Sequence, residues 1–228
     1  MTRYRAVLLA AFVAVWIWAA INPVFPHDWF LENILVVLFV PVLLLAGRYF
    51  KLSDVSYTLL TIFMILHLIG SHYTYSEVPF GYTLQSWFGA NRNMYDRVVH
   101  FSFGFLLAYP VREIFLRLAH VRGFWGLYLP LDLTLAFSAI YEIIEWLAAA
   151  YVDPAAGIAF LGTQGDVWDA QKDMLLAGTG AVLAMLITAA VNLLCNPDFS
   201  GEMRSSFHIE KGDAPQGEAR LRQLITRR

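Results

Sequence analysis

Charged residues are scarce in this sequence. Of its 228 residues, 15% are charged and 58% are hydrophobic, whereas an average soluble domain carries about 25% charged residues. Such a composition cannot cover the surface of a soluble protein. Cys195 is the single cysteine, which excludes an intramolecular disulfide and a thiolate metal cluster. The formal net charge of -2 does not suggest a nucleic-acid partner.

The hydrophobic residues occur in six long blocks, several of which approach the roughly 20 residues that a helix needs to cross a bilayer. None alternates in polarity as the strands of a β-barrel do, and helices are the remaining structure that satisfies the backbone in lipid. The sequence therefore predicts an all-α bundle of six transmembrane helices over residues 1–196. A polar tail follows over 197–228, with a short helix near Glu218 to Ile225. The predicted blocks are Ala6 to Ile21, Leu31 to Gly47, Val55 to Gly70, Val98 to Leu118, Trp125 to Tyr151 and Met174 to Leu194.

Two of the blocks contain prolines and charges. In the fourth block we expect a kink near Pro110, followed by an interfacial stretch in which Glu113 and Arg117 pair at a spacing of four. In the fifth block we expect the membrane-crossing helix to start near Pro130. Asp132 would then lie in its first turn, where the helix dipole favours a carboxylate.

The distribution of lysine and arginine predicts the orientation. With the N-terminus in the cytoplasm, 13 of the 16 lysine and arginine residues fall on the cytoplasmic side, as the positive-inside rule requires. Only Arg92, Arg97 and Lys172 fall on the outer side. We therefore expect both chain ends, including the tail, to be cytoplasmic.

With this topology, ionisable residues gather near the outer ends of four helices. Residues three or four apart share one helical face, so each helix carries a polar stripe. Exposing four such groups separately to lipid would cost on the order of 10 kcal/mol, which predicts that the stripes turn inward around one polar pocket. The residues are His67 and His72 in HLIGSHY, Asp96 and His100 in NMYDRVVHF, Glu142 and Glu145 in YEIIEW, and Asp166, Asp169 and Asp173 in GTQGDVWDAQKDM.

Simpler structural roles compete with a shared site. Asn93 and Asp166 are in position to cap the helices that follow them, and His67 alone is compatible with a hydrogen-bonded packing residue. The aromatic residues at this level are typical of an interfacial belt. Glu142 and Glu145 resist such explanations, because a helix C-terminus disfavours negative charge and both therefore need a partner.

At HYTYSEVP, NMYDRVVHF, YEIIEW and GTQGDVWDAQKDM the chain resembles the YjdF-type family of bacterial inner-membrane proteins, and the likeness extends over roughly Met1 to Asn196. The resemblance implies a bacterial inner-membrane location but no reaction. A more distant likeness is to VanZ-like proteins, in which an acidic residue and a histidine open one helix and an acidic helix pair follows. The VanZ-like pattern has Gln where this chain has Glu145, so that residue's role does not transfer.

Three hypotheses for function follow. The first is chemistry on, or binding of, a lipid head group or lipid-linked phosphate at the outer leaflet, assisted by a divalent cation. The second is a proton-coupled transporter, and the third is a non-catalytic membrane scaffold. The pattern leaves open whether the protein is an enzyme, and it makes no prediction of oligomeric state.

Specific residues are assigned under the first hypothesis. The predicted catalytic residues are Asp96, His100, Glu142, Glu145, Asp169 and Asp173. The predicted metal ligands are His67, His72, Glu145, Asp169 and Asp173. The predicted substrate-binding residues are Tyr73, Tyr95, Gln164, Asp166 and Lys172.

Overall fold

Helices make up the regular secondary structure of the described chain. The computed structural model describes residues 2–151, 161–208 and 216–226, and these residues contain no strand. The helices are α1 (Arg3–Ala20), α2 (Pro26–Ala46), α3 (Asp54–Tyr73), α4 (Pro79–Phe88), α5 (Tyr95–Leu118), α6 (Trp125–Tyr151), α8 (Asp169–Cys195), α9 (Phe199–Ser205) and α10 (Gln216–Thr226).

Six of these helices, namely α1, α2, α3, α5, α6 and α8, are long and apolar enough to cross a membrane. They contain 18 to 27 residues, and at 1.5 Å per residue they approach or exceed the roughly 30 Å of a hydrocarbon core. The predicted six-helix bundle is therefore confirmed. Large apolar side chains such as Val7, Val42 and Leu186 are exposed on its surface, as expected for faces that contact lipid.

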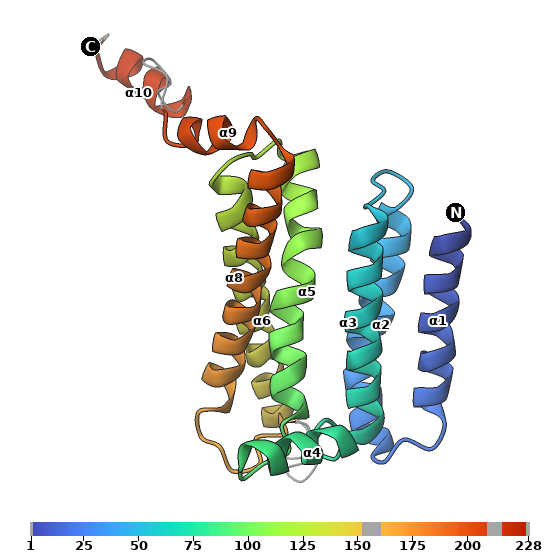
Figure 1. Cartoon of the computed structure of the whole chain (residues 1–228). Coiled ribbons are helices and arrows are strands. Elements are labelled where there is room, and N and C mark those ends of the chain that lie inside the picture. Colours follow the sequence, from blue (N-terminus) through green and yellow to red (C-terminus); the bar gives the residue numbers. More distant parts are fainter. Residues whose placement is uncertain (1, 152–160, 209–215, 227–228) are drawn as a thin grey trace.

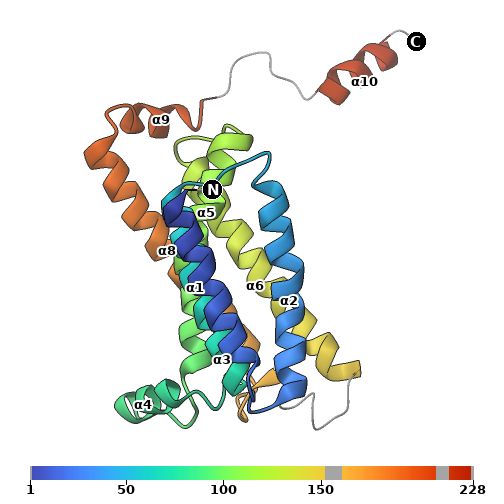
Figure 2. The same cartoon turned by 90° about the vertical axis from the view of Figure 1, so that its right-hand side faces the viewer.

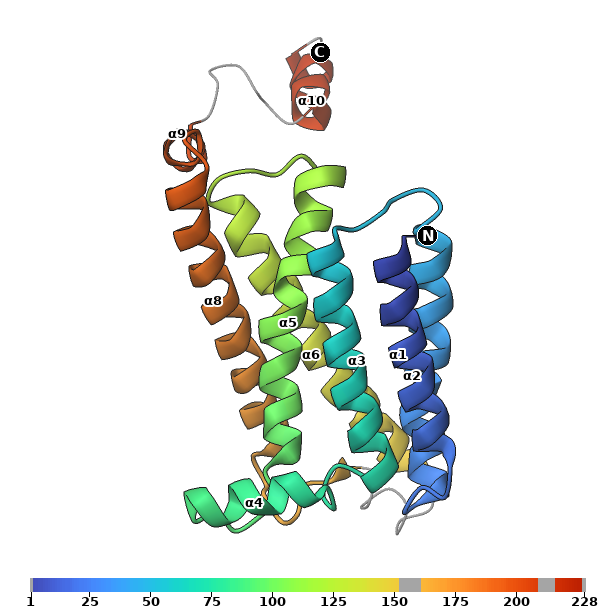
Figure 3. The same ribbon diagram turned by 45° about the vertical axis from the view of Figure 1, so that its right-hand side comes forward.

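Polar caps and prolines define where several helices begin. Ser53 Oγ accepts a hydrogen bond from the N–H of Ser56 at the start of α3. Pro26 and Pro79 lie in the first turns of α2 and α4, where a missing N–H breaks no helical hydrogen bond. The sequence did not predict α4, a ten-residue helix that lies across one end of the bundle (Figures 1 and 3).

The fifth predicted block, Trp125 to Tyr151, is one helix, but the expected helix start near Pro130 is wrong. Helix α6 begins at Trp125 and continues through Pro130, so the exposed Asp132 lies beyond its first turn. Contacts of the residues before Pro130 stabilise this earlier start. Phe124 stacks on Tyr128 at a ring-centroid distance of 5.6 Å, and Trp125 Nε1 donates to the carbonyl of Ser206 at 2.8 Å.

Helix α5 continues through Pro110 to Leu118 as one helix, and the predicted kink stays a prediction. The expected pairing beyond the proline is present, since Arg117 Nη1 lies 2.6 Å from Glu113 Oε1.

Helices α5, α6 and α8 pack together, and α3 lies between α5 and α1 (Figure 1). The approach of α5 to α8 depends on two glycines. A side chain at Gly104 would collide with the backbone of Ala177 and Ala181, and one at Gly180 would collide with the backbone of Phe101 and Phe105. These glycines therefore permit the close approach of α5 to α8, and a side chain at either position would push the two helices apart.

The order of the helices defines two ends of the bundle. Helices α3 and α6 end, and α5 and α8 begin, at the end crossed by α4 (Figure 1); we call this the acidic end. The opposite end carries the N-terminus and the loops α2–α3 and α5–α6, and we call it the amino-terminal end.

The tail begins with a helix that packs on the bundle. In α9, Glu202 Oε1 lies 3.1 Å from Arg122 Nη1. Directly after α9, Ser206 Oγ accepts a hydrogen bond from the N–H of Phe124 at 2.8 Å. Helix α10 covers the short helix predicted near Glu218 to Ile225. Three of the cations used to orient the chain, Lys211, Arg227 and Arg228, lie outside the described residues. The division into a domain of 1–196 and a tail stays a prediction.

Candidate functional site

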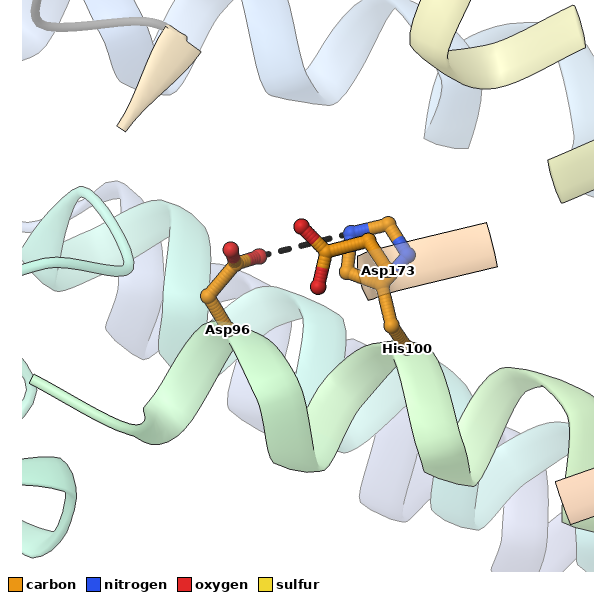
Figure 4. Close-up of side chains that lie close together, drawn as sticks. All are labelled: Asp96, His100 and Asp173. Atoms are coloured by element: carbon orange, nitrogen blue, oxygen red, sulfur yellow. Dashed lines mark ion pairs between the residues drawn. The ribbon is translucent and has the colours of Figure 1, made fainter. Parts of the chain in front are cut away.

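Three side chains from two helices converge at the acidic end. Asp96 and His100 are four residues apart on α5, and His100 Nε2 lies 3.4 Å from Asp96 Oδ1. Asp173, one turn into α8, points toward the same space (Figure 4). One ligand atom from each of the three lies within 4.8 Å of the others. We call Asp96, His100 and Asp173 the triad.

The chemistry of the triad suits a cation. Two carboxylates and one imidazole are ligands for Mn²⁺ or Zn²⁺, and three protein ligands leave coordination positions open for water or a substrate. The Asp173 side chain is 3% exposed, and those of His100 and Asp96 are 10% and 15% exposed. Within the described part of the chain, the triad is the only group of three or more acidic, histidine or cysteine side chains that converges in this way.

Two buried arginines hold the neighbouring aspartates. Arg97 reaches Asp169 and Asp173 at 2.5 Å and Asp166 at 3.0 Å. Arg92 pairs with Asp169 and, at 3.1 Å, with Asp96. It also donates to the carbonyls of Gly162 and Thr163 at 3.1 and 3.3 Å. We call Arg92 and Arg97 the arginine clamp, because they tie the start of α5 to the start of α8 and to the loop before it.

The sequence analysis used both arginines only to orient the chain. A signal for Arg92 is present in the spacing of RNMYDRVVH, where Arg92 lies four residues before Asp96, which in turn shares a helical face with His100. The missing information was that α8 lies against this face.

Glu142 and Glu145 lie on the neighbouring helix α6 and line a pocket of about 410 Å³. The pocket opens between α6 and the start of α8, and Trp146, Asp166 and Asp169 are among its other lining residues. Glu142 Oε1 lies 3.7 Å from His100 Nδ1. That buried oxygen has no hydrogen-bond partner among the described residues. The pocket and the triad are therefore adjacent, with Glu142 and His100 between them.

A second polar cluster lies beside this site. His67 Nδ1 is 2.6 Å from the hydroxyl of Tyr75, and His67 Nε2 is 3.3 Å from the carbonyl of Glu32. The Glu32 side chain accepts a hydrogen bond from Tyr141 at 3.1 Å, which joins α2 to α6 near the acidic end (Figure 2). Glu32 is a buried carboxylate that the sequence analysis missed, although a lone glutamate near the outer end of an apolar block is a recognisable signal.

The structure does not gather the predicted metal ligands into one set. His67 faces Tyr75 and Glu32, and His72 Nδ1 lies 3.1 Å from the carbonyl of Ala19 in α1. Asp169 contacts both arginines of the clamp, whereas Asp96 and Asp173 each contact one of them. Of the predicted ligands, only Asp173 belongs to the triad, while Asp96 and His100, predicted as catalytic residues, supply the rest.

The predicted substrate-binding residues are mostly engaged in protein contacts. Tyr73 packs against His72 and Trp18, and the hydroxyl of Tyr95 donates to the carbonyl of Leu66 at 2.8 Å. The Gln164 amide bonds both the N–H and the carbonyl of Asn93, at 2.8 and 3.3 Å. Those contacts join the loop before α8 to the segment before α5.

Asn93 and Asp166 form short turns just before α5 and α8. Asn93 Oδ1 accepts from the N–H of Tyr95, and Asp166 Oδ1 accepts from the N–H of Trp168. Both acceptors lie two residues before their donors, which is the spacing of an Asx turn. Neither residue is the helix N-cap that the sequence predicted, because Met94 and Trp168 hold those positions and make no side-chain capping hydrogen bond.

Asp166 lies in the loop between α6 and α8, and its other oxygen faces two cations. Lys172 Nζ is 2.6 Å and Arg97 Nη2 is 3.0 Å from Asp166 Oδ2. The hydrogen bond from Lys172, followed by that from the Trp168 N–H, lowers the pKa of the Asp166 carboxyl below its ordinary value. Asp166 is therefore ionised at neutral pH and already paired.

The model of one protein family, described as "Predicted membrane protein (DUF2238)", matches residues 4–193. The chain belongs to the DUF2238 family. The match covers the six membrane-crossing helices, the triad and the arginine clamp, and it ends before α9.

A curated DUF2238-type relative confirms the resemblance to YjdF-type proteins. The chain is 41% identical over 167 residues to "Inner membrane protein YjdF" of Escherichia coli (strain K12), covering 72% of this chain and 79% of the relative. No solved structure matches the chain significantly. Together with the six apolar helices, these findings make this DUF2238 member an integral protein of the bacterial inner membrane. The more distant likeness to VanZ-like proteins stays a prediction.

Proposed function

We propose that the triad binds a divalent cation and that this cation holds the phosphate of a lipid head group or lipid-linked substrate in the adjacent pocket. The observation that carries the proposal is the convergence of Asp96, His100 and Asp173 within 4.8 Å. Carboxylate and imidazole on facing helices are the ligands that helix bundles use for metal sites.

The charge balance supports a bound cation. Six carboxylates lie at the triad and around the pocket, and the positive side chains that contact them are Arg92, Arg97 and Lys172. When all six are ionised, three negative charges remain beside these three cations, and a divalent cation would offset two of them and let a phosphate approach with less repulsion. The six are Asp96, Asp166, Asp169, Asp173, Glu142 and Glu145.

The roles of the predicted catalytic residues divide under this proposal. Asp96, His100 and Asp173 bind the cation. Glu142 has an oxygen without a hydrogen bond at the edge of the pocket, which suits a general base that accepts a proton from water or from a substrate hydroxyl. Asp169 acts as a positioning residue, because both arginines of the clamp contact its carboxylate.

The proposed orientation places the pocket at the outer leaflet. With both chain ends in the cytoplasm, the amino-terminal end carries most of the lysine and arginine residues, as the positive-inside rule requires. The acidic end then lies at head-group depth on the periplasmic side.

Thermal unfolding of the purified chain tests cation binding. A ligand that binds only the folded protein raises its stability, and at a hundredfold excess over Kd we expect Mn²⁺ or Zn²⁺ to raise the unfolding temperature by about 5–10 °C over chelator. The Asp96→Asn/Asp173→Asn double variant should lose this rise. A short-chain phosphatidic acid should add a further rise only when the cation is present.

The matched control is Asp166→Asn, which removes an aspartate paired with Arg97 and Lys172 but leaves the triad intact. It should keep the cation-dependent rise from a lower starting temperature. An equal cation-dependent rise of the unfolding temperature in Asp166→Asn and in Asp96→Asn/Asp173→Asn would overturn the proposal. Absence of any cation-dependent change in the unaltered chain would favour the scaffold hypothesis, in which the arginine clamp serves only to join α5 and α8.

A proton-coupled transporter is the second candidate, and one observation favours it. Thr134 and Ser138 are buried on α6 and continue the face of Glu142 in steps of four residues toward the amino-terminal end. Ser138 Oγ has no hydrogen-bond partner among the described residues. Proton flux into vesicles that contain the purified chain, abolished by Glu142→Gln and reduced by Ser138→Ala, would establish this function instead.

A further inference from the structure

A separate groove lies between α1, α2 and α3 at the amino-terminal end. It has a volume of about 300 Å³, and its walls are mainly apolar side chains such as Leu9, Phe12, Val40, Leu43 and Met64. The outward faces of α1 and α2 beside it are also apolar and exposed. The groove therefore lies at hydrocarbon depth and is bordered by membrane.

Positive side chains surround the mouth of the groove. Arg5, Arg48 and Lys51 line it, and the described residues that line it include no carboxylate. Asp54 at 2.6 Å and the carbonyl of Leu52 at 3.0 Å hold the Arg5 guanidinium. Arg48 and Lys51 are exposed, and neither side chain has an ion pair or hydrogen bond in the described part of the chain.

We infer that this groove binds an anionic glycerophospholipid, with one acyl chain between α1, α2 and α3 and the phosphate against Arg48 and Lys51. An apolar wall alone cannot select a ligand within a membrane, because lipid tails are as apolar as the side chains they would replace. The selection must come from charge, and unpaired cations at head-group depth attract anionic lipid. The depth of the groove excludes a soluble partner that cannot enter hydrocarbon.

This lipid site is independent of the proposed cation site. The groove lies at the opposite end of the bundle, and none of its lining residues belongs to the triad or to the pocket beside it. The outcome of its test therefore does not bear on the proposed function.

Native mass spectrometry of the purified full chain tests the inference, with dioleoyl phosphatidylglycerol and dioleoyl phosphatidylcholine as probes. We expect one retained phosphatidylglycerol and weaker binding of phosphatidylcholine. Loss of both unpaired cations in Arg48→Gln/Lys51→Gln should weaken phosphatidylglycerol binding by about thirtyfold and leave phosphatidylcholine binding unchanged.

The control variant is Arg3→Gln/Arg122→Gln, which removes two cations at the same end that do not line the groove. It should change phosphatidylglycerol binding by less than about threefold. An equal loss in both double variants would show a general surface attraction and would overturn the inference.

A second pair of variants tests the acyl-chain part of the site. Leu43→Trp, or Val40→Phe if the first does not fold, fills the groove without changing its charge and should lower retention of phosphatidylglycerol. Glycerol 3-phosphate, which has no acyl chain, should not bind. Undiminished lipid retention in a folded groove-filling variant, tight binding of glycerol 3-phosphate, or a co-purified peptide that is lost in Arg48→Gln/Lys51→Gln would each contradict a lipid occupant.

Discussion

Each end of the bundle holds a buried glutamate, and the two carboxylates differ in their hydrogen bonds. At the amino-terminal end, Glu113 accepts from the N–H and the hydroxyl of Ser53, from the hydroxyl of Ser56, and from Arg117, at 2.6–2.9 Å. At the acidic end, Glu142 is buried to a similar degree. Its Oε1 has no hydrogen-bond partner within the described chain.

The difference separates a carboxylate whose two oxygens are hydrogen-bonded from one whose Oε1 has no hydrogen bond and lies 3.7 Å from His100 Nδ1. The hydrogen bonds of Glu113 join the start of α3 to α5 and satisfy both carboxylate oxygens, so no further ligand is required. A buried oxygen without a donor is unfavourable in a protein interior unless water, a proton or a ligand reaches it. At the acidic end, Glu142 Oε1 can therefore still accept a hydrogen bond or contact a bound cation.

The arginines at the two ends show the same contrast, and replacing them should give the largest effect. Arg97 is buried and faces three aspartates, whereas Arg117 is about half exposed. We expect Arg97→Leu to lower the free energy of unfolding by about 3–5 kcal/mol, because it leaves buried aspartates without a counter-charge. Titration with SDS followed by circular dichroism measures this.

Arg117→Leu is the matched variant at the other end, with an expected loss of at most about 1 kcal/mol. Similar losses in the two variants would mean that burial does not distinguish the two ends, and the comparison would fail.

Replacement of the two glutamates by glutamine tests the contrast directly. Glu113→Gln should cost about 1–3 kcal/mol of unfolding free energy, because an amide group would face donors that now have an acceptor. Glu142→Gln should be nearly neutral in the absence of a cation, because its Oε1 accepts no hydrogen bond. The same SDS titration in chelator compares them, and a larger cost for Glu142→Gln would reverse our interpretation.

The pH dependence of Asp166 gives the smallest expected effect. Its folded pKa is lowered by the hydrogen bonds from Lys172 and the Trp168 N–H, so its stabilising contribution is present above the unfolded value of about 3.9 and is lost as the pH falls through the folded pKa. We expect the difference in unfolding temperature between the unaltered chain and Asp166→Asn to be constant near neutral pH and to shrink below about pH 4. A difference that grows on acidification would contradict the assignment.

Much of the fold could be predicted from the sequence, because lipid imposes a simple length and polarity rule on each helix. All six blocks are helices, and the i,i+4 pair of Glu113 and Arg117 follows from helical spacing alone. Helix α4 was missed because its ten residues are too few to span a membrane. The helix start expected near Pro130 was wrong because the turn before it is held by contacts with Ser206 and Phe207, about 80 residues later in the chain.

For the site, the sequence by itself determined which helix ends carry ionisable side chains and which of these share a helical face, since both depend only on spacing along the chain. It did not determine which faces meet. Only the close packing of α5 against α8, which Gly104 and Gly180 permit, brought Asp173 to Asp96 and His100 and turned Arg92 and Arg97 toward the aspartates. The packing of α3 against α1 and α2 likewise directed His72 and His67 to other partners, because contacts between helices depend on how each is rotated and how closely it approaches its neighbours.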